Sequence, residues 1–181
     1  MKNILLLFTL LSVGFSSFSQ EKKKIEADKK SSYITYAMKH PMHDWDAKSN
    51  MAKSVIVYNS TSQKIEAVAV VVPVKSFDSG NSNRDSHAIE VLEALKFPNV
   101  SFSASSIQES DSQVTAKGNL TFHGVSKPVE LKATKSVIKN AIKLEGGFTI
   151  NMKDFAVEPP GLMGIKTDDK ITIKYSMVFP L

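Results

Sequence analysis

The stretch Lys170–Phe179 has the sequence KITIKYSMVF, in which apolar residues stand at every second position. Successive side chains of a β-strand point to opposite faces of its sheet, so this alternation turns one face toward an apolar interior. Gln113–His123, with the sequence QVTAKGNLTFH, has the same rhythm. We expect both stretches to be strands of an antiparallel sheet that is buried on one face.

Six further stretches have strand character, which makes eight predicted strands in all. These six are Tyr33–His40, Ser54–Asn59, Lys64–Lys75, Val100–Ile107, Val129–Ser136 and Ala141–Met152. Turn-forming residues separate most of them, for example Gly124–Pro128 between the fifth and sixth strands. With so many amphipathic strands, a parallel architecture is disfavoured, and an antiparallel barrel or a sandwich remains. An eight-stranded barrel would have no exposed edge and could hold one small ligand.

The sequence predicts one short helix, Asp85–Leu95, with Asp85 or Ser86 as its N-cap. Its apolar residues follow the i, i+3, i+4, i+7 spacing of a helix with one apolar face; they are Ala88, Val91, Leu92 and Leu95. Pro98 stops the helix from continuing.

Composition excludes several functional classes. The chain has 181 residues, a net charge of +5 and no cysteine, which rules out disulfide scaffolds, thiol catalysis and iron–sulfur clusters. Arg84 is the only arginine among 23 basic residues, whereas nucleic-acid-binding proteins concentrate arginine, so we expect no nucleic-acid partner. The lysine cluster Lys22–Lys24 favours a solvated segment and is compatible with transient contact with a membrane surface.

The N-terminal residues have the pattern of a secretory signal peptide. One lysine, Lys2, precedes an apolar run from Ile4 to Phe18, and small residues stand at Ser17 and Ser19. We therefore predict a signal peptide over residues 1–19, cleavage after Ser19, and a periplasmic or secreted protein. Residues 20–31 are rich in lysine and glutamate and are expected to form a flexible leader, followed by a barrel domain over residues 32–181.

The predicted inward faces mix small and aromatic residues. The small ones are Ala69, Ala104, Ala116, Gly118, Ala133 and Gly146, and the aromatic ones are Phe102, Phe122, Phe148 and Tyr175. This mixture is typical of a hollow interior that holds a ligand. It is equally typical of a barrel in which small residues make room for neighbouring side chains, so the pattern leaves both interpretations open.

Three segments of the chain, in this order and spacing, resemble the signature of the YceI-like family. The first joins Asn83–His87 to Lys96–Phe102 through the short helix, the second is Gly118–Val129, and the third is Ile150–Phe155. The resemblance implies an exported protein with a lipocalin-like, eight-stranded antiparallel β-barrel. It also implies binding of long-chain isoprenoids, quinones or related amphiphilic lipids inside the barrel. The segment Lys39–Asp46 departs from the usual family pattern, so head-group recognition could differ.

Two polar clusters are candidate binding sites. His40 and His43, with Asp44 and Asp46, could ligate zinc only if a turn at Pro41 brought the two imidazoles together. The alternative, which we favour, is a polar rim with Trp45 packed over it, so we predict no metal site.

The second cluster, Arg84, Asp85 and His87, stands at the predicted helix start, where free N–H groups attract anions such as a phosphate or carboxylate head group. The favoured alternative is structural, with Arg84 bonded to a carboxylate and Asp85 as the cap.

The sequence contains no recognisable catalytic constellation, so we expect a binding protein without enzymatic activity or cofactor. The leading hypothesis is that the barrel sequesters a long-chain amphiphilic lipid with its polar head near one rim. The expected ligand-binding residues are Phe102, Phe122, Phe148, Tyr175, Arg84, His87 and Trp45. The alternative is a structural or stress-related envelope protein, whose barrel is filled by its own side chains and whose role lies on its surface.

Overall fold

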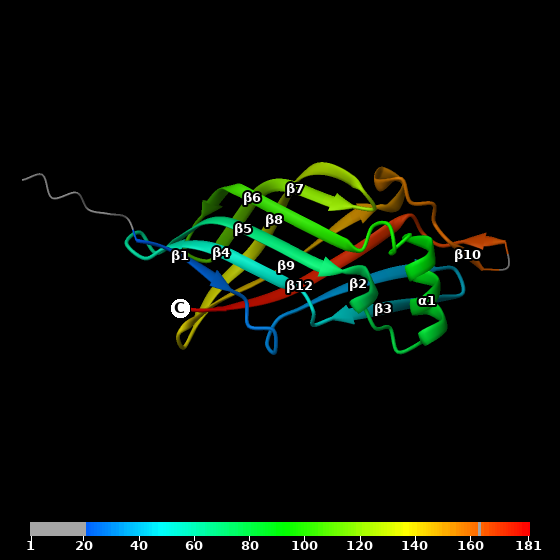
Figure 1. Cartoon of the computed structure of the whole chain (residues 1–181), viewed down its shortest axis with the longest axis horizontal. Helices are drawn as coiled ribbons and strands as arrows, with labels where there is room; N and C mark the ends of the chain where they lie inside the picture. The colour runs from blue at the N-terminus through cyan, green and yellow to red at the C-terminus, as the bar shows by residue number, and fades with distance from the viewer. Residues whose placement is uncertain (1–20, 163) are drawn as a thin grey trace, which may run out of the picture.

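The computed structural model describes residues 21–162 and 164–181. Ten strands form one antiparallel sheet that curls into a half-barrel, with the order β1-β4-β5-β6-β7-β8-β9-β12-β2-β3 (Figure 1). The strands are β1 (Lys22–Glu26), β2 (Tyr33–His40), β3 (His43–Ser49), β4 (Lys53–Asn59), β5 (Lys64–Pro73), β6 (Asn99–Glu109), β7 (Gln113–Phe122), β8 (Val125–Ile138), β9 (Ala141–Asn151) and β12 (Lys170–Pro180). The all-β, antiparallel fold predicted from the alternation is confirmed, but the sheet has ten strands instead of eight, and it is a half-barrel with β1 and β3 at its edges instead of a closed barrel.

Short elements surround one end of the sheet. The helix α1 (Ser82–Val91) and the small hairpin formed by β10 (Gly161–Leu162) and β11 (Ile165–Lys166) both lie at this end (Figure 1). Two 3₁₀ turns, η1 (Val74–Ser76) and η2 (Met152–Phe155), follow β5 and β9. We call this end of the sheet the mouth, and the opposite end, where the chain terminates, the floor.

All eight predicted strands are present in the ten-stranded sheet, and β1 and β3 are its two additional strands. In β3 the inward positions are Trp45, Ala47 and Ser49, whereas the outward positions are charged, so few apolar residues mark the strand. Hydrogen bonding to β2 across the turn at Pro41 and Met42 establishes it instead. β3 therefore forms because a neighbouring strand supplies backbone partners that its composition does not reveal.

The expectation of a flexible leader over residues 20–31 is wrong for Lys22–Glu26, which form β1. These five residues pair in register with β4, from Lys22 opposite Asn59 to Glu26 opposite Val55. Ile25 packs against buried apolar residues, and Ala27 N–H donates to the Ser54 carbonyl at 2.8 Å. The sheet therefore begins ahead of the predicted domain boundary at Ser32. The predicted signal peptide and its cleavage site lie outside the described residues.

The helix and one turn differ from their predicted boundaries. α1 begins at Ser82, three residues earlier than expected, and Leu92 follows it as its C-cap. Glu93 then has a positive φ of 44°, which ends the helix before Leu95, and Leu95 is fully exposed. The predicted loop Gly124–Pro128 is much shorter, because His123 and Gly124 form a tight turn with φ values of 49° and 74° and β8 starts at Val125.

The apolar interior consists of two clusters. The first cluster contains Ile34, Ala52, Ile56, Ile65, Val72, Val114, Ala133, Ile142, Leu144, Met177 and Phe179. The second cluster contains Met38, Phe102, Ala104, Ala116, Leu120, Phe122, Met152, Phe155, Val157 and Ile171. Ala69, expected inside, is exposed, and its neighbours Val68 and Val70 face the interior instead. Since nearly every residue of Lys64–Lys75 around it is apolar, the sequence could not reveal which face was buried.

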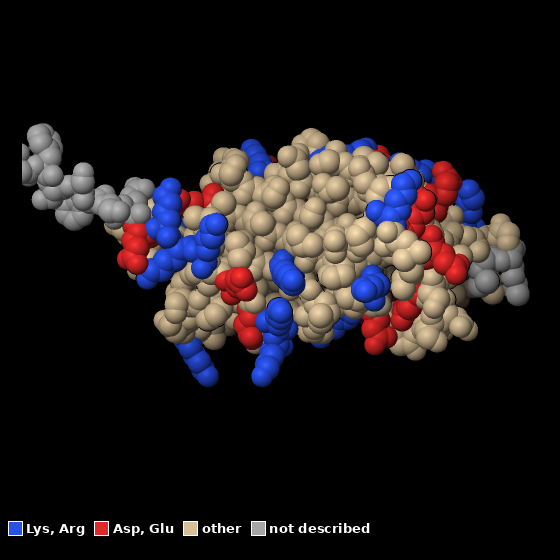
Figure 2. Space-filling view, in the orientation of Figure 1, with Lys and Arg blue, Asp and Glu red and all other residues tan. Residues whose placement is uncertain are grey.

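The face of the molecule seen in Figure 2 carries charged side chains mainly toward its two ends. On the face shown in Figure 2, most Lys, Arg, Asp and Glu side chains gather near the floor and near the mouth, and the middle of the sheet is largely uncharged. A hollow outside the curl of the sheet is lined by residues of β4, β5, β6 and β7, such as Val57, Ala67, Ser103 and Lys117.

Candidate functional site

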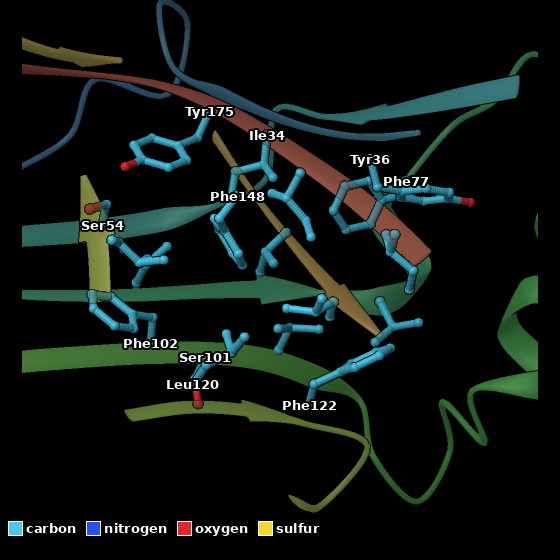
Figure 3. Close-up of a pocket in the computed structure, with 18 of the residues that line it drawn as sticks. Ile34, Tyr36, Ser54, Phe77, Ser101, Phe102, Leu120, Phe122, Phe148 and Tyr175 are labelled. Carbon is cyan, nitrogen blue, oxygen red and sulfur yellow. The ribbon is translucent and has the colours of Figure 1, made fainter. Parts of the chain in front are cut away.

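A cavity of about 240 Å³ lies inside the curl of the sheet. Its wall comes from β2–β9 and β12, and α1 contributes Ala88 and Val91 at the mouth. The lining is almost entirely aliphatic and aromatic, as the close-up in Figure 3 shows. The charged side chains that line it are Arg84 and Asp85, which, like His87, belong to α1. Because few polar groups face the interior, an apolar chain is the kind of molecule that this wall would bind.

The four predicted aromatic residues all line the cavity. Phe102 of β6 and Phe122 of β7 are 7% and 4% exposed, and Phe148 of β9 and Tyr175 of β12 are half-buried. They come from four strands but share one face of the sheet because each stands in the inward phase of its strand. The alternation of apolar residues therefore placed these side chains correctly.

Tyr175 is accommodated by a glycine in the neighbouring strand. Gly146 lies opposite Tyr175 in the β9–β12 pair, and a Cβ atom at Gly146 would overlap both the Tyr175 hydroxyl and the Lys132 carbonyl oxygen. The Tyr175 hydroxyl donates to that carbonyl at 3.1 Å. Burial raises the pKa of Tyr175 to about 12. The ring therefore stays neutral, with its hydroxyl fixed to the wall of the sheet.

Trp45, Arg84 and His87 stand together at the mouth, and all three line the cavity. The Arg84 guanidinium carbon lies 5.4 Å from the centre of the Trp45 ring, a cation–π geometry. The predicted Arg84–carboxylate brace is not formed among the described residues. Asp85 is not the N-cap either: Asn81 caps α1 by accepting from Arg84 N–H at 3.1 Å, and Asp85 accepts from Ser79 N–H. His87 is exposed, and its ring nitrogen lies 3.9 Å from Glu90.

His40 and His43 face each other across the β2–β3 hairpin, with ring centres 5.6 Å apart. His40 is buried; its Nδ1 accepts from Met42 N–H at 3.1 Å, and its Nε2 lies 3.1 Å from the Ile165 carbonyl oxygen. His43 stacks next to Trp45 at 5.5 Å. Both nitrogens of His40 are thus engaged by the backbone, consistent with a structural role at the rim. Within residues 21–162 and 164–181, no three His, Asp or Glu side chains cluster as metal ligands.

His123 connects the segment that follows α1 to the sheet, and it was not among the predicted site residues. His123 Nε2 lies 3.0 Å from a carboxylate oxygen of Glu93, and its Nδ1 lies 3.3 Å from the Phe155 carbonyl oxygen. Phe97 packs edge-on against the same ring at 4.6 Å. Glu93 and His123 both have positive φ values, which are uncommon for residues other than glycine. Because tertiary packing imposes these backbone conformations, the sequence pattern does not indicate the contact.

Further lining residues were also absent from the predicted site. Tyr36 and Phe77 pack with ring centres 5.2 Å apart near the mouth. Burial, with a smaller contribution from the nearby Asp85, raises the pKa of Tyr36. Tyr36 shares one face of the predicted strand Tyr33–His40 with Ile34 and Met38, so the alternation could have added it to the site. Ser54 lines the cavity near the opposite end (Figure 3). It was not predicted to be a site residue, because a single serine beside an apolar run does not indicate a binding role.

In the part of the chain that the structure describes, no helix is both long and apolar enough to cross a bilayer.

Comparison with known proteins gives consistent results for family and fold. The model of the YceI-like domain matches residues 26–179. Protein YceI of Salmonella newport (strain SL254) is 28% identical over 138 residues, which are 74% of this chain and 72% of that protein.

Three solved structures resemble the fold at low sequence identity. BcnA of Burkholderia cenocepacia aligns with a TM-score of 0.74 and 18% identity, covering 84% of this chain and 98% of that one. A polyisoprenoid binding domain from Saccharophagus degradans aligns with a TM-score of 0.71 and 11% identity, and the alignment covers 86% of this chain and 97% of that one. A Campylobacter jejuni YCEI protein aligns with a TM-score of 0.62 and 16% identity, and the alignment covers 100% of this chain and 99% of that one. Since the family model spans most of the chain, this protein belongs to the YceI-like family.

Proposed function

We propose that this protein binds an amphiphilic lipid whose apolar chain occupies the cavity of the curled sheet. The observation that carries the proposal is the cavity itself, which is walled by aliphatic and aromatic side chains from eight strands. Burial of an apolar chain there is favoured by roughly 25 cal/mol for each Å² removed from water. The similarity in fold to a polyisoprenoid binding domain supports the same class of ligand.

The size of the cavity limits how much of a ligand it holds. Its volume of about 240 Å³ is slightly below the roughly 300–1,000 Å³ of common ligand pockets. A short isoprenoid or acyl chain fits this space, and a long chain requires side chains to move or part of the chain to extend through the mouth. The proposal therefore concerns polyisoprenoids, quinones and fatty-acid derivatives as a class.

The proposed role is binding without catalysis, in an exported protein. The absence of a catalytic motif in the sequence and the signal-like N-terminus support these two points. Mass spectrometry of the protein purified from cells would test both export and ligand. We expect a mature chain that begins at Gln20 and an organic extract that contains a lipid.

Phe148→Asp tests whether the cavity is the binding site. The substitution puts an unpaired carboxylate into an apolar wall and should greatly reduce retention of the lipid. Thr149→Asp is the matched control, because Thr149 is the next residue of β9 and is exposed on the outer face. Trp45 is the sole tryptophan and lines the cavity, so its emission reports binding directly. If Phe148→Asp stays folded and retains the same lipid load as Thr149→Asp, the cavity is not the site.

A further inference from the structure

Ser54 has a hydroxyl group without a hydrogen-bond partner inside the cavity. It is 4% exposed, and among the described residues only Ser54 Oγ and Thr167 Oγ1 are buried side-chain atoms that lack a partner. Ser54 lines the cavity, whereas Thr167 does not. A buried hydroxyl that makes no hydrogen bond is costly, and native proteins rarely keep one without a reason.

Ser54 stands far from the charged mouth. It lies on β4 opposite Val70, and in Figure 3 it appears with Phe102 and Tyr175 at the end of the cavity away from α1, with Tyr36 and Phe77 at the other. The Tyr175 hydroxyl already donates to Lys132, and the Ser54 carbonyl accepts from Ala27. The Ser54 hydroxyl is therefore a free polar group at the deep end of an apolar space.

The surroundings of Ser54 determine which group it can bind. A hydroxyl both donates and accepts, so it pairs equally well with an alcohol or a carbonyl. The charged residues that line the cavity, Arg84 and Asp85, are on α1 at the mouth. Among the described residues, no charged side chain lines the deep end to offset the desolvation of a phosphate or a carboxylate, so a charged head group is disfavoured there.

We propose that the ligand is inserted with a neutral hydroxyl or carbonyl end first, that this oxygen hydrogen-bonds to Ser54, and that the apolar chain runs toward the mouth. This inference rests on the proposed function, since it requires that the cavity holds a lipid. It adds the chemistry of the inserted end and the orientation, opposite to the head-at-the-rim arrangement expected from the sequence.

The test compares two ligands that differ mainly in one oxygen. Farnesol carries a hydroxyl, and farnesene is the corresponding hydrocarbon; binding of each is followed by the emission of Trp45. The unaltered protein should bind farnesol about five- to tenfold more tightly than farnesene, the range expected for one neutral hydrogen bond. Ser54→Ala should abolish this preference and leave the affinity for farnesene unchanged or slightly higher.

Two further variants control for effects on folding. Thr167→Ala removes the other unpartnered buried hydroxyl, which is outside the cavity, and should keep the preference for farnesol. Ser54→Cys nearly keeps the side-chain volume and weakens the hydrogen bond, so it should lower the preference even if Ser54→Ala folds poorly.

The outcomes separate the inference from the proposed function. If both ligands bind with equal affinity to the unaltered protein, or if the preference for farnesol survives in both Ser54 variants, the inference is wrong and the lipid-binding proposal stands. If Ser54→Ala weakens the binding of farnesol and of farnesene equally, Ser54 contributes only to packing, and the inference is overturned. If neither ligand binds to the unaltered protein, both the inference and the proposed function fail for this class of lipid.

Discussion

Replacement of Lys135 by methionine should destabilise the protein strongly, because Lys135 neutralises a buried carboxylate. Lys135 Nζ bonds to one oxygen of Glu109, and the other oxygen accepts from Ile65 N–H at 2.8 Å. The two side chains are 12% and 6% exposed. Removing one partner of a buried ion pair costs about 3–5 kcal/mol, since the remaining charge stays desolvated. For a chain of this size, that cost lowers the melting temperature by roughly 6–20 °C.

Lys143→Met provides the matched control. Lys143 also pairs with a glutamate, Glu145, at 2.8 Å, but the two side chains are 30% and 48% exposed. A surface ion pair of this kind contributes less than about 1 kcal/mol. Urea unfolding of both variants and the parent protein measures the two free energies. A loss below about 1 kcal/mol for Lys135→Met, or equal losses for both variants, would refute the reasoning.

Three further predictions concern the site. Since burial raises the pKa of Tyr175 to about 12, its contribution to stability is complete below its unfolded pKa of about 10 and is lost as the pH rises toward 12. In urea unfolding, the free energy of unfolding of Tyr175→Phe should fall less at alkaline pH than that of the parent protein. An identical fall in both proteins would contradict this. Arg84→Lys keeps the charge but loses the planar group over Trp45, so tryptophan emission should shift while the free energy of unfolding falls by at most about 1 kcal/mol. A strong chelator should leave the melting temperature unchanged, and a fall restored by zinc would assign His40 and His43 to a metal site.

Strand positions were predictable wherever burial on one face leaves an alternating sequence. Lys170–Phe179 and Gln113–His123 show this directly, and the observed strands β12 and β7 differ from them by a single residue at one end. β3 and β1 could not be found in this way, because their stability comes from backbone bonds to β2 and β4. Ala69 was misplaced because nearly all of its neighbours in the strand are apolar, so the sequence does not show which residues face the interior.

The cavity wall was more predictable than its polar groups. The phase of each strand placed Phe102 and Phe148 on one surface. Arg84 was rightly placed at the start of the helix, but its partner is the ring of Trp45, which belongs to a strand that was not predicted. The role of Ser54 could not be predicted at all, because whether a hydroxyl has a partner depends on atoms from other strands.

The two interpretations of the interior apply to different ends of the same sheet. Near the floor, Ile56, Ile142 and Phe179 are at most 1% exposed, and Ile56 and Ile142 do not reach the cavity, so this part is filled by its own side chains. Farther along, Gly146 lets the Tyr175 ring lie against the wall, and Ala116 and Ala133 line the space without filling it. The packed floor supplies stability that a hollow barrel would lack, and the small residues keep the adjoining volume open. Filling of the floor thus does not argue against ligand binding; it limits the depth to which a chain can be inserted.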